Sequence, residues 1–166
     1  SVLGKLTFNH PNDTESASTY YIGNTMSVNW TSSGTVGNVQ LQYSSNNGSD
    51  GYPYVIYNST GGQYFNQSHT YSWAIPEGAN LTNQIRVKVF SVSNPTTVYA
   101  IEPSPTTIKG TLHVDQPAGN EVWNVGDLHY INWTRHGTQM GNVSILYSLN
   151  SGSSYPGTLD TQTAVE

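Results

Sequence analysis

The sequence contains no cysteine, and only 9% of its 166 residues are charged. Without cysteine there is no disulfide scaffold, iron–sulfur cluster or cysteine-ligated zinc site, although an extracellular location is still allowed. The ten acidic and five basic residues are scattered, so they form no basic stripe of the kind that binds nucleic acid. No apolar run approaches the length of a membrane span, so we expect no membrane insertion of this segment.

Helical periodicity is also missing, because no segment spaces its apolar residues by three and four over several turns. The sequence has twelve Tyr, four Trp and regularly spaced Val and Ile among abundant Ser, Thr, Asn and Gly. Disordered chains are poor in aromatic and β-branched residues, so this composition predicts a folded, all-β protein. A composition poor in charge and rich in hydroxyl groups favours an extracellular location.

One motif occurs twice and organises the chain. Val28-Asn29-Trp30-Thr31 returns as Ile131-Asn132-Trp133-Thr134. The neighbouring matches are Ile22-Gly23 with Val125-Gly126, Gly37-Asn38-Val39 with Gly141-Asn142-Val143, and Tyr52-Pro53 with Tyr155-Pro156. The register slips by only one residue across the matches, so chance is a poor explanation, and a repeat of this kind governs the domain assignment.

The repeat divides the chain into a complete first unit, residues 1–109, and the first half of a second unit, residues 110–166. A unit of the first one's length can bury a core of its own. Residues 2–11 also align with residues 108–117, which makes Gly4 the equivalent of the junction residue Gly110. Residues 1–5 are therefore either the tail of a preceding strand or the start of the mature protein.

Alternation of apolar and polar residues predicts the strands. In the first unit they fall at residues 6–8, 26–30, 39–43, 54–57, 71–75, 84–92, 98–101 and 106–108, with residues 12–19 turn-like. In the second unit they fall at residues 112–114, 130–134 and 143–148, followed by a polar tail. Short strands at this spacing predict an antiparallel β-sandwich.

The second unit has no counterpart of two later strands of the first, Tyr71-x-Trp73-x-Ile75 and Ile85-x-Val87-x-Val89. Half a sandwich exposes apolar faces and open strand edges. Two explanations are open: the natural chain continues beyond Glu166, or a neighbouring subunit donates the missing strands. The junction Lys109-Gly110 is short, which predicts a stiff, rod-like string of units.

The pattern Pro117-x-Gly119-x-Glu121-Val122-Trp123-x-Val125-Gly126, continued by residues 131–134 and 141–148, resembles the Ser/Thr-rich β-sandwich repeat of bacterial and archaeal cell-surface proteins. It is also similar to the N-terminal domain of yeast cell-wall proteins implicated in β-1,6-glucan assembly. The first unit departs from the pattern, with three extra residues after Pro11 and with Tyr20 in place of Trp123. The resemblance implies tandem antiparallel Ig-like or FnIII-like β-sandwiches, the second incomplete, with surface display and no shared catalytic residues.

The tryptophans are candidates for core packing or for sugar stacking. Trp30, Trp73 and Trp133 alternate in phase with Val and Ile, which favours the core, and Trp123 completes this core signature. A second set of aromatic residues is less clearly inward and would suit self-association or glycan contact: Tyr20, Tyr21, Tyr52, Tyr54 and Tyr57.

We expect no catalytic site, metal or cofactor. Nucleophile elbows and paired carboxylates are missing from the sequence. The histidines show no metal-binding spacing; they are His10, His69, His113, His129 and His136. The loop 46–51 brings Asn46 and Asp50 together, but one carboxylate is too few for a calcium site, and Ser154 replaces Asp50 in the second unit.

Eight Asn-x-Ser/Thr sequons are present, as chance would produce in a sequence this rich in Asn, Ser and Thr. The candidate N-glycosylation sites are Asn12, Asn47, Asn58, Asn66, Asn80 and Asn142. Asn29 and Asn132 lie within predicted strands.

These features predict a non-catalytic structural module of an extracellular surface glycoprotein, such as a stalk, sheath, S-layer-like array or filament. Its expected partner is itself, through end-to-end or lateral contact, with adhesion as a related role. In the filament version, the incomplete repeat polymerises by strand complementation. The alternative is a carbohydrate-binding or spacer module of a secreted enzyme, with glycans as partners.

Overall fold

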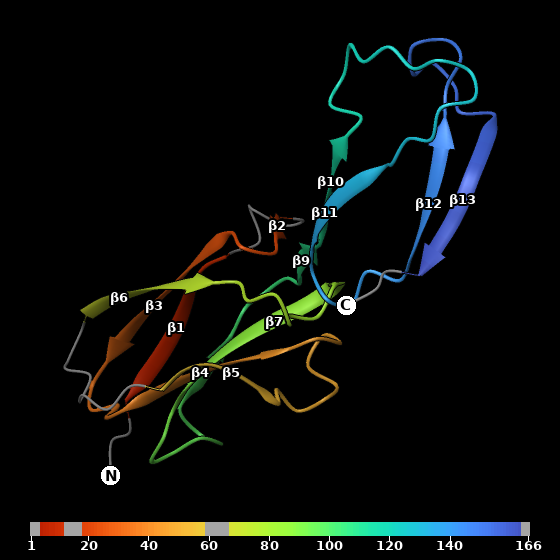
Figure 1. Ribbon diagram of the computed structural model, residues 1–166. Coiled ribbons are helices and arrows are strands. Elements are labelled where there is room, and N and C mark those ends of the chain that lie inside the picture. The colour runs from red at the N-terminus through yellow and green to blue at the C-terminus, as the bar shows by residue number, and fades with distance from the viewer. Residues whose placement is uncertain (1–3, 12–17, 59–66, 164–166) are drawn as a thin grey trace.

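The computed structural model describes residues 4–11, 18–58 and 67–163. The described residues form strands and turns and no helix, which confirms the prediction of an all-β fold. Strands β1 to β9 form two sheets, and strands β10 to β13 form two further sheets of two strands each (Figure 1).

The first unit consists of two facing sheets. One has the order β1-β3-β6, with β1 at Lys5–His10, β3 at Thr25–Ser33 and β6 at Gln67–Ala74. The other has the order β2-β9-β7-β4-β5, with β8 paired to β7. Its strands are β2 Thr19–Tyr21, β4 Val39–Ser44, β5 Tyr54–Asn58, β7 Thr82–Ser91, β8 Tyr99–Ile101 and β9 Thr106–Lys109.

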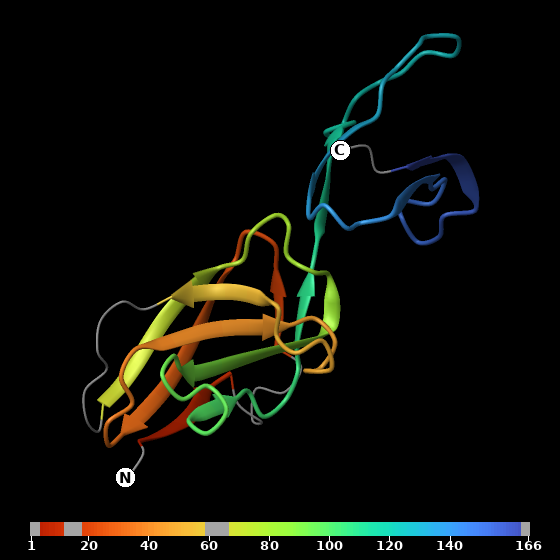
Figure 2. The same cartoon turned by 90° about the horizontal axis from the view of Figure 1, so that it is seen from below.

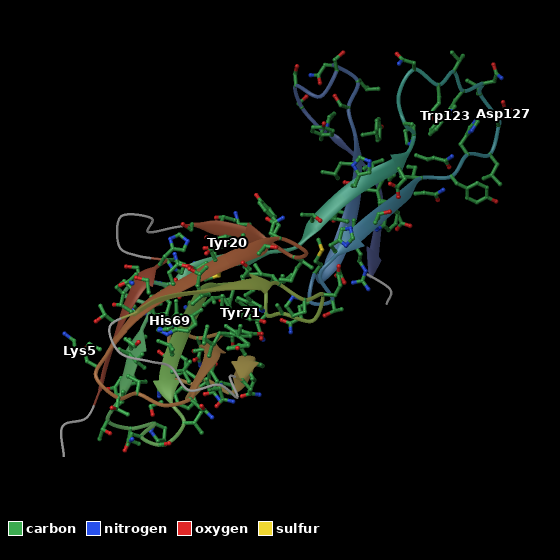
Figure 3. All side chains as sticks on the ribbon, turned by 90° about the vertical axis from the view of Figure 1, so that its left-hand side faces the viewer. Lys5, Tyr20, His69, Tyr71, Trp123 and Asp127 are labelled. Atoms are coloured by element: carbon green, nitrogen blue, oxygen red, sulfur yellow. The ribbon has the colours of Figure 1, made fainter. Side chains whose placement is uncertain are left out.

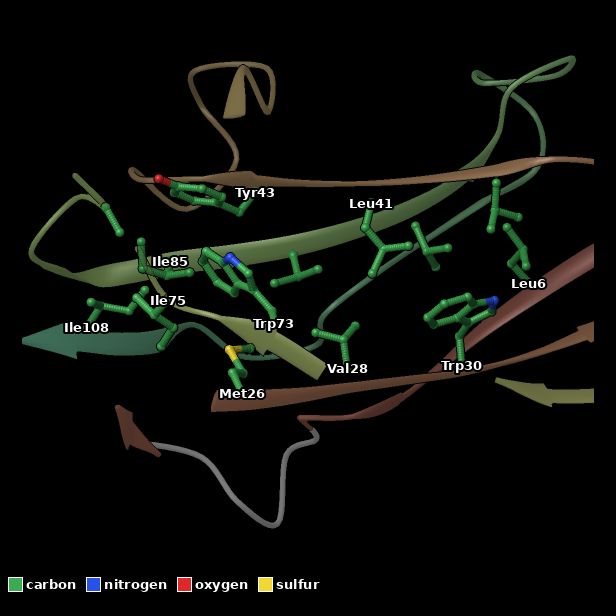
Figure 4. Packing of buried hydrophobic residues seen from close by; sticks show 14 of the residues in the cluster. Leu6, Met26, Val28, Trp30, Leu41, Tyr43, Trp73, Ile75, Ile85 and Ile108 are labelled. Atoms are coloured by element: carbon green, nitrogen blue, oxygen red, sulfur yellow. The ribbon is translucent and has the colours of Figure 1, made fainter. Parts of the chain in front are cut away.

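Alternate side chains of the two sheets meet in one core (Figure 4). Met26, Val28 and Trp30 of β3 are buried, while the residues between them, such as Ser27, stay half-buried on the outer face. The rings of Trp73 on β6 and Tyr43 on β4 lie 5.1 Å apart between centroids and join the sheets. Side chains in a strand alternate between its faces, so the period-two pattern of the sequence becomes sandwich-like packing.

Two strands depart from the sequence-based predictions. β2 lies at the end of the stretch predicted to be turn-like, and it pairs in parallel with β9 although only antiparallel pairing was expected. Three residues are too few to show a period. β13, Gly157–Thr163, pairs with β12, so the stretch described from the sequence as a polar tail contains a strand that was not predicted. Its mainly small and polar residues give no apolar alternation to detect.

In the second unit, β10 (Thr111–Gln116) pairs with β11 (Asn132–His136), and β12 (Asn142–Tyr147) pairs with β13. No further described strand pairs with either two-stranded sheet. The connection between β10 and β11 projects away from the first unit (Figure 2).

One carboxyl group is buried where the β8–β9 connection meets β7. Glu102 is 1% exposed; its Oε2 accepts a hydrogen bond from the Val87 amide at 2.9 Å, and its Oε1 lies 2.5 Å from the Thr106 hydroxyl. Burial raises the pKa of Glu102 to about 7, although the hydrogen bonds from Thr106 and Val87 oppose this shift. The carboxyl group therefore anchors the β8–β9 connection to β7, and it makes the stability of the fold depend on pH.

We expect Glu102→Gln to weaken the dependence of stability on pH. A carboxyl with an ordinary pKa of 4.5 that rises to about 7 on folding favours the folded state fully below pH 4.5, and this contribution is lost as the pH rises through 7. The loss amounts to about 3 kcal/mol in the free energy of unfolding. Urea denaturation across this range measures it. Equal slopes for the wild type and the variant would contradict the assignment.

Candidate interaction surface

The described residues contain no group of three or more His, Cys, Asp or Glu side chains placed to hold a metal ion. Three histidines have other partners: His69 stacks on Trp30 at 5.4 Å between ring centroids, His129 stacks on Trp123 at 4.4 Å, and His136 bonds to Glu77. Burial lowers the pKa of His69. These contacts give the three imidazoles packing and bridging roles.

The only carboxylate of the loop after β4 is used within the loop itself. Asp50 Oδ2 accepts a hydrogen bond from the Ser45 amide at 2.9 Å, and Oδ1 accepts one from the Tyr52 amide at 3.1 Å. Burial raises the pKa of Asp50, but hydrogen bonds from Ser44, Ser45 and Tyr52 outweigh it and lower the pKa overall. The carboxylate shapes the turn.

The second unit builds the same loop without a carboxylate. Ser148 Oγ accepts from the Gly152 amide, and Asn150 Oδ1 accepts from the Ser154 amide, both at 2.9 Å. In the first unit, Ser44 Oγ and Asn46 Oδ1 make the equivalent bonds to Gly48 and Asp50 at 2.7 and 2.8 Å. The two units therefore repeat in hydrogen-bond geometry as well as in sequence.

Strand register repeats too. Phe8 pairs with Trp30, and Val114 pairs with Trp133. In both cases the register shifts within the next two residues of the first strand. β10 and β11 are therefore the counterparts of β1 and β3, and β12 and β13 follow as the counterparts of β4 and β5.

The second unit carries an apolar groove of about 330 Å³ between the β10–β11 sheet and the β12–β13 sheet. We call it the open groove; its main lining residues are Leu112, Val114, Ile131, Trp133, Val143 and Ile145. The equivalent residues of the first unit belong to or pack against its core: Leu6, Phe8, Val28, Trp30, Val39 and Leu41. Leu112 is 47% exposed where Leu6 is 4% exposed, so the same surface is covered in one unit and open in the other.

The four tryptophans of the predicted core signature lie in different surroundings. Trp30 and Trp73 are 3% and 5% exposed, and Trp133 is half-buried in the open groove. Trp123 is 44% exposed, on the segment that projects from the second unit (Figure 3). Its counterpart Tyr20 packs against the core, because β2 is held beside β9. No described strand plays the part of β9 for Trp123.

Gly110 is the only residue between β9 and β10. A Cβ atom at this position would lie 2.7 Å from both His136 O and Met140 Sδ. The equivalent Gly4 is packed just as closely, with its Cβ position 2.6 Å from Thr35 O. Both sites therefore require glycine because another chain segment passes against the backbone.

A second contact joins the units beside this glycine. The Glu77 carboxylate accepts hydrogen bonds from His136 Nδ1 at 2.8 Å and from the Gly137 amide at 2.7 Å. The Thr138 amide donates to Glu77 O at 3.2 Å. The hydrogen bond from His136, followed by that from Gly137, lowers the pKa of Glu77. The β6–β7 turn is thus tied to the β11–β12 turn.

The structure describes four of the six candidate glycosylation sites. Asn47 and Asn142 are exposed, and Asn58, also exposed, accepts a hydrogen bond from Gln40. Asn80 lies between two tyrosines: its Oδ1 accepts from Tyr43 at 3.2 Å, and its Nδ2 donates to Tyr54 at 3.4 Å. Modification at Asn80 would disturb this pair of contacts. Asn12 and Asn66 lie outside the described residues.

On the outer face of the second sheet, three aromatic rings surround one lysine. Lys88 Nζ lies 5.6, 5.3 and 4.9 Å from the ring centroids of Tyr52, Phe90 and Tyr99. Tyr99 is 46% exposed, whereas Tyr52 and Phe90 are each 9% exposed. The surface therefore presents one accessible ring beside a cation, a combination that sequence alternation alone did not reveal.

The sequence matches no protein-family model, and it matches no curated protein. Within the described residues, no helix is long and apolar enough to cross a membrane. Three features of the described residues bear on function: the open groove, the junction and the aromatic surface.

We expect Gly110→Ala to loosen the junction. The added methyl group would collide with His136 O and Met140, at a cost of about 1–3 kcal/mol typical of overpacking. Hydrogen exchange at the Gly137 and Thr138 amides, which bond to Glu77, should accelerate by about tenfold or more. Gly78→Ala is the matched control, since no atom lies within 4 Å of a Cβ there. Unchanged exchange in Gly110→Ala would contradict the close packing.

Proposed function

We propose that the chain is a non-catalytic structural module of an extracellular surface protein, built from Ig-like or FnIII-like β-sandwiches in tandem. The junction is the observation that carries the proposal. One residue, Gly110, links the units, and the Glu77 carboxylate adds hydrogen bonds to His136 and Gly137. A connection this short, with contacts beside it, leaves little room for independent motion, whereas freely moving units need a flexible linker.

A stiff connection suits a spacer, as in a stalk, sheath, S-layer-like array or filament. The composition supports an extracellular place, with 9% charged residues and abundant hydroxyl and amide side chains. Exposed sequons at Asn47 and Asn142 are compatible with glycosylation there. Self-assembly, end to end or side by side, would build such modules into an array.

The alternative, a carbohydrate-binding or spacer module of a secreted enzyme, is favoured by one specific observation. The exposed ring of Tyr99 lies beside Lys88 on an open sheet face, with Gln40 and Gln42 half-exposed on the adjacent strand. An aromatic side chain with a polar tip can pack against a sugar ring while amides bond its hydroxyls.

Two measurements separate these functions. Small-angle X-ray scattering of the wild type, compared with Glu77→Ala, tests the structural role. We expect an extended, well-defined particle for the wild type and a broader distribution of interunit distances for the variant. Alanine has no side-chain acceptor, so Glu77→Ala loses both side-chain hydrogen bonds, the one from His136 and the one from the Gly137 amide. Identical, broad distributions for both proteins would contradict the spacer proposal.

A polysaccharide-binding panel tests the alternative. The structural module is expected to bind none of the polysaccharides, and Tyr99→Ala should then behave as the wild type. Binding that Tyr99→Ala abolishes would instead identify a carbohydrate module. Tyr21→Ala provides a matched control, because Tyr21 is similarly exposed, at 41% against 46% for Tyr99.

A further inference from the structure

The first unit contains both the surface that the second unit leaves open and the strands that cover it. β6 lies along the edge of β3, with His69 opposite Trp30 and Tyr71 opposite Val28. β7 lies along the edge of β4, with Val89 opposite Leu41 and Val87 opposite Tyr43. The corresponding edges of β11 and β12 have no partner among the described strands.

We propose that the open groove binds a pair of extended polypeptide strands with the side-chain pattern of β6 and β7, in the register that these strands adopt in the first unit. The inference rests on the proposed structural function and deepens it, because it names the partner that completes the second unit. The occupant is defined by its chemistry: apolar side chains at every second position and a backbone free to pair.

The strand added to β11 would run antiparallel to it, as β6 runs to β3. Trp133 corresponds to Trp30, whose ring stacks on His69 at 5.4 Å between centroids. The occupant therefore places a flat ring opposite Trp133 and a tyrosine-sized side chain opposite Ile131, the counterpart of Val28. Such opposed pairs are the units that stabilise a sheet.

The strand added to β12 would follow β7. Ile145 and Tyr147 correspond to Leu41 and Tyr43, which pair with Val89 and Val87. β-Branched apolar residues opposite Ile145 and Tyr147 would close the groove, and the alternate positions, Arg86 and Lys88 in β7, would face outward, where both are half-buried. The groove lining itself contains no charged side chain.

A polypeptide fits this site better than a lipid or a small apolar molecule. Either could cover the apolar residues, but only a strand can satisfy the backbone N–H and C=O groups along the edges of β11 and β12. The exposure of Trp123 supports the same conclusion. Its counterpart Tyr20 pairs with Ile108 of β9, a strand that follows β6 and β7 along the chain of the first unit. Val125, the counterpart of the buried Ile22, remains fully exposed.

The test uses the full chain and a synthetic peptide with the sequence of its residues 67–91. Hydrogen exchange of the chain is followed with and without the peptide. We expect exchange at the amides of β11 and β12 to slow by about tenfold or more, since pairing protects them. The matched peptide, in which serine replaces Tyr71, Trp73, Val87 and Val89, should give no protection.

Two protein variants locate the binding. Val143→Asp places a charge in the groove and should abolish protection, whereas Asn142→Asp adds the same charge at an adjacent, outward-facing position and should not. If Val143→Asp itself lacks the β12–β13 pairing, the comparison of the two peptides decides the question.

Equal protection by both peptides, or none by either, would overturn the inference. Protection that rises with the concentration of the chain alone, without peptide, would also overturn it, because a second copy would then be the occupant. The scattering test of interunit stiffness does not depend on any of these outcomes. A negative peptide result would therefore overturn the strand-binding proposal alone, and the spacer function would still be tested by scattering.

Discussion

A sheet with one apolar face needs a second layer over that face, and the rest of this structure depends on that requirement. In the first unit β6 and β7 extend the two sheets, and their residues Trp73, Val87 and Val89 cover the side chains of β3 and β4. In the second unit the same inward residues are present without their cover, and Leu112 and Val114 are 47% and 55% exposed. One sequence pattern thus gives a closed core or an open groove, depending only on which strands accompany it.

The junction depends on the same packing. The β6–β7 turn that carries Glu77 exists because those two strands cross from one sheet to the other, so the interunit contact is a by-product of closing the first core. Gly110 then lets β10 start directly beside His136 and Met140. Closure of one unit and placement of the next are therefore coupled through a single turn.

Much of the fold could be predicted from the sequence, because alternation reports burial directly. It placed β3, β4, β6 and β7 and put Trp30 and Trp73 in phase with the core. It missed β2 and β13, which are short or mainly polar and owe their pairing to neighbouring strands. Glu102 and Glu77 were also missed, since Glu102 bonds to Val87 on another strand and Glu77 bonds to His136 in the other unit. Trp123 is exposed because no described strand holds its segment against a core, as β9 holds β2 in the first unit. The residues around Trp123 do not reveal whether such a strand is present.

The parallel pairing of β2 with β9 has a mechanical consequence. Tension along a string of such units would enter the first unit through β1 and leave it through β9, at opposite ends of the sandwich (Figure 1). To extend the unit, β9 must slide lengthwise past β2 and β7, so its hydrogen bonds to both neighbours would be loaded together in shear. A strand peeled from a free hairpin loses its bonds one after another. This arrangement would therefore resist pulling along the chain more than pulling across it.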